Sequence, residues 1–360
     1  MWVHTGRLPH VLAPHCYHAP EHHARELAAL FAGGWHGITT RDALRSPGDF
    51  ITTEVIGEPV LVRNCDGEIR AFQNVCAHRH SLLTTRPRGT SPRMRCQYHG
   101  WEYDADGRSL RVPDARSFVP IRRGGECLRR FRVATLGQLV FVSLAEDGPS
   151  LRDALGEPTS TLIEQVVSSD YRQVAAWTIE HAANWKIPVE NALESYHIPE
   201  VHPKTFRKLS EARHATHTLT ASFTALESSA PPSQLRWIAA RWRRAPRHVY
   251  AHHHAFPSLL LAHTDISSLA QIVLPTSPTT SRSHAFCFVH GGDGRQLLHR
   301  ALAPVVQRLV ERYTREVLRE DNVIFASVQR GLAASGHPGV IGAREERVHA
   351  FQQYVARALA

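Results

Sequence analysis

Long apolar runs are missing from this sequence of 360 residues. No stretch approaches the roughly 20 consecutive apolar residues that a membrane-spanning helix needs, and residues 1–15 contain no apolar segment of the signal-peptide type. We therefore expect a cytoplasmic protein with no membrane partner. The composition, 42% hydrophobic and 21% charged, is typical of a globular chain with room for about two domains.

Lysine is scarce, and the basic residues do not cluster. The formal net charge is +9, but the only lysines are Lys186, Lys204 and Lys208, and the arginines are scattered along the chain. Nucleic-acid-binding proteins usually carry a clustered basic face or a recognisable docking motif, and this sequence has neither. We predict no nucleic-acid partner, whereas an acidic protein partner would be steered by such a surface.

Cysteine is also scarce, because six cysteines in a chain of this size are too few for a disulfide framework. Only Cys76 and Cys96 have histidines at ligand spacing, and we expect the others to be reduced and largely buried. These others are Cys16, Cys65, Cys127 and Cys287. No Rossmann-type glycine fingerprint opens a helix after a strand, which argues against a nicotinamide or flavin domain.

The predicted secondary structure changes in character twice along the chain. A helix is predicted over 20–35, and short β-rich runs with turn signals such as CDGE then predict a small all-β domain. After a boundary near 156–165, mixed helices and strands predict an α+β domain. Its expected elements are a helix at 188–197, strands near 216–227, 257–274 and 284–290, and two or three helices after 294. We place the domains at 38–155 and at 1–37 with 156–360.

Two short segments of the all-β region carry metal-ligand residues. CAHRH begins at Cys76 and CQYHGW begins at Cys96, so that His78 and His99 follow at ligand spacing. Two thiolates and two imidazoles suit tetrahedral zinc or a two-iron cluster with two histidines on one iron, and the spacing leaves both open. Zinc fingers commonly group their cysteines, whereas here each segment supplies one cysteine and one histidine. This arrangement favours a two-iron cluster held between two hairpin tips.

These segments resemble those of the Rieske iron-sulfur family, and the sequence HGWEYDADG at the second pair is close to the family's motif. Respiratory Rieske proteins add a cysteine beside each ligand pair, where this chain has Ser81 and Tyr98. Fewer hydrogen bonds to the sulfurs favour a low potential, which is typical of the oxygenase type. His80 stands where many relatives have glycine, and we predict that it is a tolerated surface residue.

A second pair of possible ligands lies in LESYHIPEVHP. A helix over about 188–197 would end with His197, and His202, five residues later, would lie about 140° around a continuous helix. Pro199 disfavours helix at the residue before it, so we predict that the helix ends just after His197 and that His202 swings back. Glu194, three residues before His197, is one candidate for a third ligand.

A competing carboxylate lies near the C-terminus. Two imidazoles and one carboxylate are the ligands of non-heme Fe(II) oxygenases, and zinc hydrolases use similar sets. Asp321 falls on an apolar helical stripe, where a carboxylate needs a partner or a metal. The stripe consists of Val317, Ile324 and Val328. Glu316 and Glu320 fall nearer the predicted polar face.

The sequence motifs of the predicted α+β domain resemble those of the catalytic domain of Rieske non-heme iron oxygenases. The resemblance rests on Asn-Trp-Lys, Glu-x-Tyr-His-x4-His-Pro and a late Glu-Asp helix ending in Val-Gln-Arg-Gly-Leu. It implies an antiparallel-sheet-and-helix domain of the helix-grip type, with mononuclear Fe(II) on His197, His202 and Asp321. Glu194 would carry electrons between the cluster of one subunit and the iron of its neighbour in a homotrimer.

The resemblance also implies the co-substrate and the partners. It implies a [2Fe-2S] cluster on Cys76, His78, Cys96 and His99, O2 as co-substrate, and a separate flavin and iron-sulfur reductase or a ferredoxin. NAD(P)H would act only through that reductase. The α-type chain and the glutamate at position 194 resemble the choline, carnitine and betaine-oxidising branch, so hydroxylation or oxidative demethylation of a small organic molecule is expected.

Other functions compete with this expectation. Within the same family, arene cis-dihydroxylation is the alternative, while a pure Rieske electron carrier or a zinc hydrolase would leave half of the ligand residues unexplained. A betaine-like substrate favours an aromatic cage, although each candidate is first expected to be a core aromatic. The candidates are Trp177, Trp237, Trp242 and Tyr250. The run 252–254, three histidines, is expected on a strand or loop surface.

Overall fold

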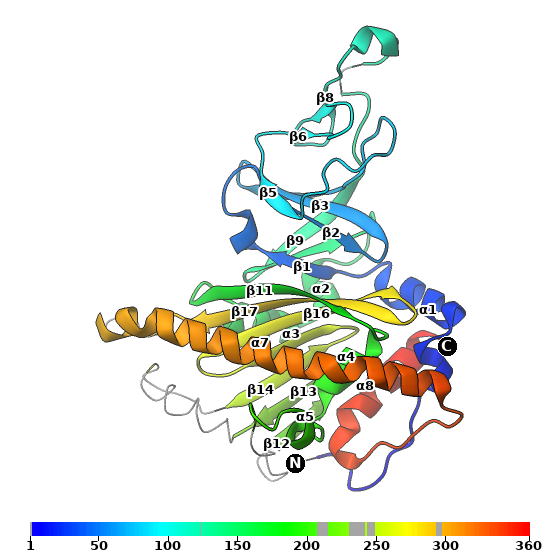
Figure 1. The fold of residues 1–360 in the computed structure, drawn as a ribbon, viewed down its shortest axis with the longest axis vertical. Helices are drawn as coiled ribbons and strands as arrows, with labels where there is room; N and C mark the ends of the chain where they lie inside the picture. The colour runs from blue at the N-terminus through cyan, green and yellow to red at the C-terminus, as the bar shows by residue number, and fades with distance from the viewer. Residues whose placement is uncertain (1, 123, 207–214, 230–241, 243–248, 293–296) are drawn as a thin grey trace. The chain divides into compact units, whose positions relative to one another are not determined.

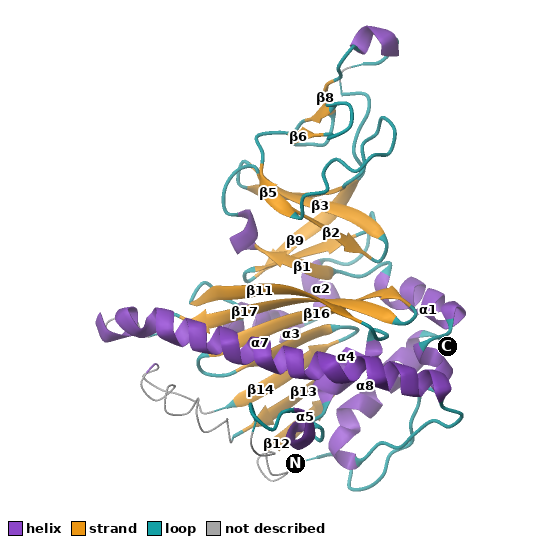
Figure 2. Cartoon of the chain, viewed as in Figure 1, coloured by secondary structure: helices purple, strands orange, loops and turns teal. Residues whose placement is uncertain are grey.

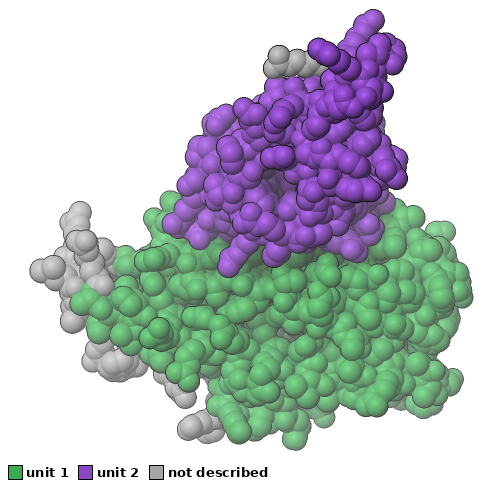
Figure 3. All heavy atoms as spheres, turned by 45° about the horizontal axis from the view of Figure 1, so that its top comes forward, with its two compact units in different colours: residues 1–31, 155–360 green, residues 32–154 purple. Residues whose placement is uncertain are grey.

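The chain forms two compact units, which Figure 3 colours separately. Unit 1 comprises Met1–Phe31 with Leu155–Ala360, and unit 2 comprises Ala32–Ala154. The computed structural model describes residues 2–122, 124–206, 215–229, 242, 249–292 and 297–360. No helix in this described part combines the length and the apolar character that crossing a membrane requires.

Unit 2 is built from β-strands, coloured orange in Figure 2. Its larger sheet has the order β1-β10-β9-β4-β3-β2-β5, and its smaller sheet has the order β6-β7-β8. The larger sheet consists of β1 (His36–Thr40), β2 (Asp49–Val55), β3 (Glu58–Cys65), β4 (Glu68–Gln73), β5 (Arg88–Thr90), β9 (Arg130–Leu136) and β10 (Leu139–Ser143). The smaller one consists of β6 (Met94–Arg95), β7 (Glu102–Tyr103) and β8 (Ser109–Arg111).

The predicted turn in CDGE joins β3 and β4. Cys65 pairs with Glu68, and both residues between them have positive φ, 55° at Asp66 and 99° at Gly67. Aspartate followed by glycine favours this conformation, in which the turn matches the twist of the two strands. The turn fixes the pairing register, and thereby places the apolar residues of β3 and β4 in the core of unit 2.

Unit 1 contains an antiparallel sheet of seven strands in the order β11-β17-β16-β15-β14-β13-β12 (Figure 1). The strands are β11 (Tyr171–His181), β12 (Ala215–Leu219), β13 (Phe223–Ser228), β14 (Tyr250–Ala255), β15 (Leu259–His263), β16 (Ser267–Ser277) and β17 (Thr280–His290). Its helices include α1 (Pro20–Glu26), α3 (Glu157–Val166), α4 (Lys186–Leu193), α5 (Ile198–Val201), α7 (Leu297–Ala334) and α8 (Glu346–Ala358). A short helix, α2 (Leu151–Leu155), lies in unit 2 apart from its last residue. Helix α7, orange in Figure 1, crosses one face of this sheet.

Two of the predicted elements form differently. The helix expected over 188–197 ends at Leu193, because the Glu194 carboxylate accepts hydrogen bonds from the backbone N-H groups of Tyr196 and His197. Such local bonds compete with the helix for the backbone. Pro199 does not end this helix; it lies in the first turn of α5, where its missing N-H leaves no bond unmade.

The three histidines of β14 were expected at a surface, and this expectation is wrong. His252, His253 and His254 are all buried. Burial lowers the pKa of His253 to about 4 and that of His254 to about 3, so both rings are neutral at ordinary pH. His253 bonds to Thr159 and His254 to the carbonyl of Pro257, as expected for structural histidines.

The N-terminal segment anchors α4 through buried charges. Lys186 Nζ lies 2.5 Å from Glu26 Oε1, and both side chains are 0% exposed. One turn further along α4, Glu190 accepts hydrogen bonds from the Tyr17 hydroxyl at 2.5 Å and from Gln352 at 3.0 Å. Helix α4 leads directly into Glu194 and the first candidate iron ligand, so these contacts position the site.

Replacing Glu190 with glutamine should change how stability depends on pH. Burial raises the pKa of Glu190 from 4.5 to about 7, against the lowering effect of its hydrogen bonds to Tyr17 and Gln352. The stabilisation by the protonated form is complete below pH 4.5 and is lost as the pH rises through about 7. Relative to wild type, the free energy of unfolding of Glu190→Gln should therefore rise by about 2 kcal/mol between pH 5 and pH 8.

Urea unfolding at pH 5 and pH 8 measures this difference. Glu21→Gln, an exposed change in the first turn of α1, is the control and should follow the wild-type curve. Parallel pH dependences for wild type and Glu190→Gln would show that Glu190 does not titrate in this range.

Candidate metal centres

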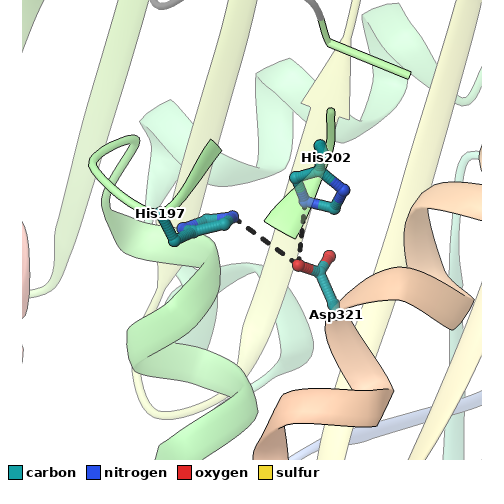
Figure 4. A group of neighbouring side chains, drawn as sticks. All are labelled: His197, His202 and Asp321. Carbon is teal, nitrogen blue, oxygen red and sulfur yellow. Dashed lines mark ion pairs between the residues drawn. The ribbon is translucent and has the colours of Figure 1, made fainter. Parts of the chain in front are cut away.

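Three predicted ligands from distant parts of the chain meet in unit 1 (Figure 4). His197 precedes α5, His202 follows it, and Asp321 lies on α7. One ligand atom from each lies within 4.8 Å of the other two. Asp321 Oδ1 is 3.0 Å from His202 Nε2 and 3.6 Å from His197 Nε2. We name these three residues, which are the predicted iron ligands, the iron-ligand group.

Both imidazoles of the group present Nε2 because carboxylates hold their other nitrogens. His202 Nδ1 is 2.8 Å from Glu320 Oε2, and His197 Nδ1 is hydrogen-bonded to Glu194 Oε1. A proton on each Nδ1 leaves the Nε2 lone pair free for a metal. Burial acts to lower the pKa of His202, but Asp321 and Glu320 outweigh it and raise the pKa. The donor set of two neutral nitrogens and one carboxylate fits Fe(II).

The carboxylate of this group is that of Asp321, while Glu194 lies behind His197. Glu194 uses one oxygen for His197 Nδ1 and the other for backbone N-H groups. Asn191, on α4, donates to Asp321 Oδ1 at 2.9 Å and orients that side chain. Among the described residues of unit 1, no other three potential ligands lie this close together.

Asp321 was expected on a buried apolar stripe of α7. The structure places Asp321 beside the two histidines, but the predicted stripe is not buried. Ile324 is 38% exposed and Val328 is 40% exposed, whereas Phe325 and Gln329 are buried. Asp321 lies one turn before Phe325, beside the buried face of the helix. The helix pattern therefore selected Asp321 correctly, but the residues that it assigned to the buried face are not the buried ones.

Glu320 was assigned to the polar face, and its side chain instead turns toward the site. It accepts a hydrogen bond from Thr205 Oγ1 at 2.6 Å as well as from His202. Its position directly before Asp321 was the available signal, because consecutive helical residues differ by about 100° and a long side chain can reach the neighbouring face. Asn191 had no signal of its own in the sequence.

In unit 2, the two cysteine-histidine segments form matching turns. Cys76 N donates to Ser81 O at 2.8 Å and Cys96 N donates to Trp101 O at 2.8 Å. Each turn has a left-handed residue at the same place, with φ 58° at His80 and 72° at Gly100. His80 is exposed, and histidine is one of the side chains that adopt this conformation more readily.

The four ligand residues of these turns face one another. Cys76 and Cys96 are 1% and 2% exposed, and the rings of His78 and His99 lie 4.7 Å apart. The Nδ1 atom of His78 is buried without a hydrogen-bond partner among the described residues, as a nitrogen reserved for a metal would be. Burial, followed by His99 and Arg79, lowers the pKa of His78 and favours the neutral imidazole.

Tyr103 is a further residue of this site that the motif did not reveal. Its hydroxyl accepts a bond from Ala77 N at 3.0 Å and lies 3.0 Å from Cys76 Sγ, toward which its hydrogen is free to point. A hydrogen bond to a ligand sulfur tunes the potential of an iron-sulfur cluster. Two thiolates and two imidazoles at the tips of two turns fit a [2Fe-2S] cluster, although the geometry alone also suits zinc.

Comparison with known proteins decides between these options. Residues 34–132 match the family model of the Rieske [2Fe-2S] domain, and residues 168–360 match that of the ring hydroxylating alpha subunit, catalytic domain. The chain belongs to the ring-hydroxylating alpha subunit family. The resemblance stated from the sequence is thereby confirmed, as are the all-β Rieske domain and the α+β catalytic domain.

Two relatives within this family are oxygenase subunits. The carnitine monooxygenase oxygenase subunit of Escherichia coli K12 is 28% identical, over 86% of this chain and 81% of that protein. The glycine betaine monooxygenase oxygenase subunit of Pseudomonas aeruginosa UCBPP-PA14 is 34% identical, over 52% of this chain. That match spans 43% of the Pseudomonas protein, which is less than half its length.

A solved structure shares the complete fold. The quaternary ammonium Rieske monooxygenase CntA, bound to an inhibitor, superposes with a TM-score of 0.81 at 24% identity. The superposition covers 97% of this chain and 95% of that one. At this level of identity, the likeness establishes the arrangement of both units' elements and not the substrate.

The aromatic residues considered for a substrate cage divide into different environments. Trp242 is buried, donates from Nε1 to His290 O at 2.8 Å and packs with Trp177 in one apolar cluster. Trp242 is thus a core aromatic, as first expected, and Trp177 is partly buried against the same cluster. Tyr250 is half-buried on β14, and Trp237 lies outside the described residues.

Glu320→Gln should weaken divalent-metal binding at the iron-ligand group. Glutamine keeps an oxygen near His202 Nδ1 but removes the charge that holds its proton, and changes of this kind typically lower metal affinity by about 10- to 100-fold. Competition with a chelator on protein reloaded with Fe(II) measures the affinity. Glu316→Gln, on the same helix but paired with Arg319, is the control. Equal affinities for both variants would show that Glu320 does not support the site.

Proposed function

We propose that this chain is a terminal oxygenase that uses O2 and electrons from a separate reductase to hydroxylate or oxidatively demethylate a small organic molecule. The observation that carries the proposal is that one chain holds both donor sets: two thiolates with two imidazoles, and two imidazoles with one carboxylate. A pure electron carrier needs only the first set. A zinc hydrolase needs only the second.

The proposed division of labour follows the predicted domains. Residues 38–155 would hold the [2Fe-2S] cluster on Cys76, His78, Cys96 and His99, and residues 1–37 with 156–360 would hold Fe(II) on the iron-ligand group. When bound, the cluster supplies electrons and the mononuclear iron supplies the oxygen chemistry. The protein contributes fixed ligands: Glu194 and Glu320 keep the Nδ1 protons in place, and Asn191 orients Asp321.

Glu194 is the proposed route for electrons. Its carboxylate is bonded to the ring of His197, and its side chain is only 11% exposed. In the family resemblance, an acid at this position connects a cluster histidine of one subunit to an iron-binding histidine of its neighbour. The proposal therefore includes a homotrimer.

The proposed electron donor is a flavin and iron-sulfur reductase or a ferredoxin, so NAD(P)H is needed only through that partner. A cytoplasmic location is also proposed, because thiols remain reduced there and all six cysteines are free. The names of the relatives favour quaternary ammonium compounds such as carnitine or glycine betaine as substrates. Arene cis-dihydroxylation uses the same donor sets and is the alternative.

The proposed reaction is tested by substrate-dependent oxygen uptake with a surrogate reductase. With carnitine or glycine betaine, we expect uptake together with an oxygenated product or released formaldehyde. Asp321→Ala should abolish both and leave the visible absorption of the cluster unchanged, because only the iron-ligand group loses a donor. Loss of the cluster in Asp321→Ala would contradict the assignment of the two sites.

Glu194→Gln should separate electron supply from metal binding. The amide keeps the size of the side chain but lacks the charge beside His197 Nδ1, so Fe(II) affinity should fall as it does in Glu320→Gln. In protein saturated with Fe(II), both metals should be present while product formation becomes undetectable. Iron content, the spectrum of the reduced cluster and product yield are measured together. Glu200→Gln, exposed on α5, is the matched control. Normal turnover by Glu194→Gln would refute the relay.

A further inference from the structure

Arg347 is a buried cation that pairs with no carboxylate among the residues the structure describes. It lies in the first turn of α8 and is 1% exposed. Its guanidinium donates to two neutral groups, from Nε to Thr224 Oγ1 at 3.1 Å and from Nη2 to His252 Nδ1 at 3.0 Å. Burial lowers the pKa of Arg347 to about 9, and the guanidinium remains charged at neutral pH. A buried charge of this kind normally has a counter-ion.

The nearest acids in the sequence do not supply this counter-ion. Glu346 accepts bonds from the backbone of Val3 and His4 and from the ring of His217. Glu345 accepts the backbone N-H of Gly342. Within the described ranges, no aspartate or glutamate forms an ion pair with Arg347. Its two hydrogen bonds leave from Nε and Nη2, and Nη1 makes none to a described residue.

The strand register places Arg347 on the same face of the sheet as α7. His252 pairs with Ala262, Ala262 with Leu269, and Leu269 with Cys287. Directly paired residues of neighbouring strands point to the same side of a sheet, so these four side chains form one row. Arg347 contacts the row at His252, and α7 contacts it where Cys287 meets Thr314.

The face that carries this row is only partly covered. Ala262, Leu269 and Gln271 retain accessible surface, whereas their neighbours on the opposite face, Leu261 and Ala270, are buried. On α7, the Tyr313 hydroxyl is buried without a hydrogen-bond partner among the described residues. Although a long helix crosses this face, it therefore keeps partly exposed side chains and a hydroxyl that bonds to none of the described residues.

Tyr250 lies on the same face as this row and near the iron-ligand group. Its side chain is two residues from His252 on the same strand, and therefore lies on the same face. Burial raises the pKa of Tyr250, and Arg347 and Asp321 are both close enough to act on it as charges. The guanidinium and the carboxylate of Asp321 are thus both near the Tyr250 hydroxyl.

From this arrangement we propose that Arg347 binds a carboxylate group of the substrate. A guanidinium with free N-H groups in a desolvated site matches the planar, doubly accepting geometry of a carboxylate. The bound carboxylate would supply the missing counter-ion and fix one end of the molecule, leaving its other end toward Asp321. This inference rests on the proposed function, whose substrate it narrows to acids and away from unsubstituted arenes.

Equilibrium binding without reductant tests the inference independently of turnover. Titration calorimetry compares glycine betaine and carnitine with choline, which has a hydroxyl in place of the carboxylate of glycine betaine. We expect wild type to bind one or both acids at least about tenfold more tightly than choline, as the loss of a charge-assisted pair implies. Arg347→Gln should remove this preference, and Arg347→Lys should retain part of it. Arg357→Gln, exposed on the same helix, should bind like wild type.

Every result bears on the proposal. Equal binding of choline and glycine betaine by wild type, binding of neither acid, or an unchanged preference in Arg347→Gln would overturn it. If circular dichroism shows that Arg347→Gln is unfolded, the wild-type preference and Arg347→Lys decide. Iron and cluster contents are measured on the same samples, so a protein that binds acids but lacks the metals contradicts the proposed function and leaves the carboxylate subsite intact.

Discussion

Two hydrogen bonds between carboxylates and imidazoles determine what the catalytic unit can bind. Glu194 holds Nδ1 of His197 and Glu320 holds Nδ1 of His202, so both Nε2 atoms face Asp321. Without these bonds either ring could rotate or take the other tautomer, and the three donors would no longer converge. The proposed iron site and the proposed electron route both depend on this orientation.

The orientation in turn depends on contacts far away in the sequence. Helix α4 is held in place by Lys186 and Glu190, whose partners come from the N-terminal segment and from α8. Helix α7 is fixed by its packing on β17 and supplies Asp321 and Glu320 together. Residues that lie more than a hundred positions apart thereby become neighbours, as the bond between Asn191 and Asp321 illustrates. Stability and metal binding are therefore coupled in this unit.

The sequence was most informative where spacing along the chain alone fixes geometry. Cys76, His78, Cys96 and His99 lie in two short turns, and their ligand pattern follows directly from those turns. It was less informative where side chains override backbone tendencies, as at Glu194, whose carboxylate ends α4 early. Burial of β14 and the outward face of α7 near Ile324 are tertiary properties, and no local pattern revealed them. Glu320 and Arg347 gain their meaning only from partners on other elements.

The central claim is that one chain carries two iron centres of different kinds. Mössbauer spectroscopy of protein grown on ⁵⁷Fe and reconstituted anaerobically measures this directly. The account predicts about two thirds of the iron in a [2Fe-2S] cluster with histidines on one iron, and about one third as mononuclear high-spin Fe(II) that disappears in Asp321→Ala. A spectrum of cluster iron alone, with no mononuclear component in fully reconstituted wild type, would contradict it.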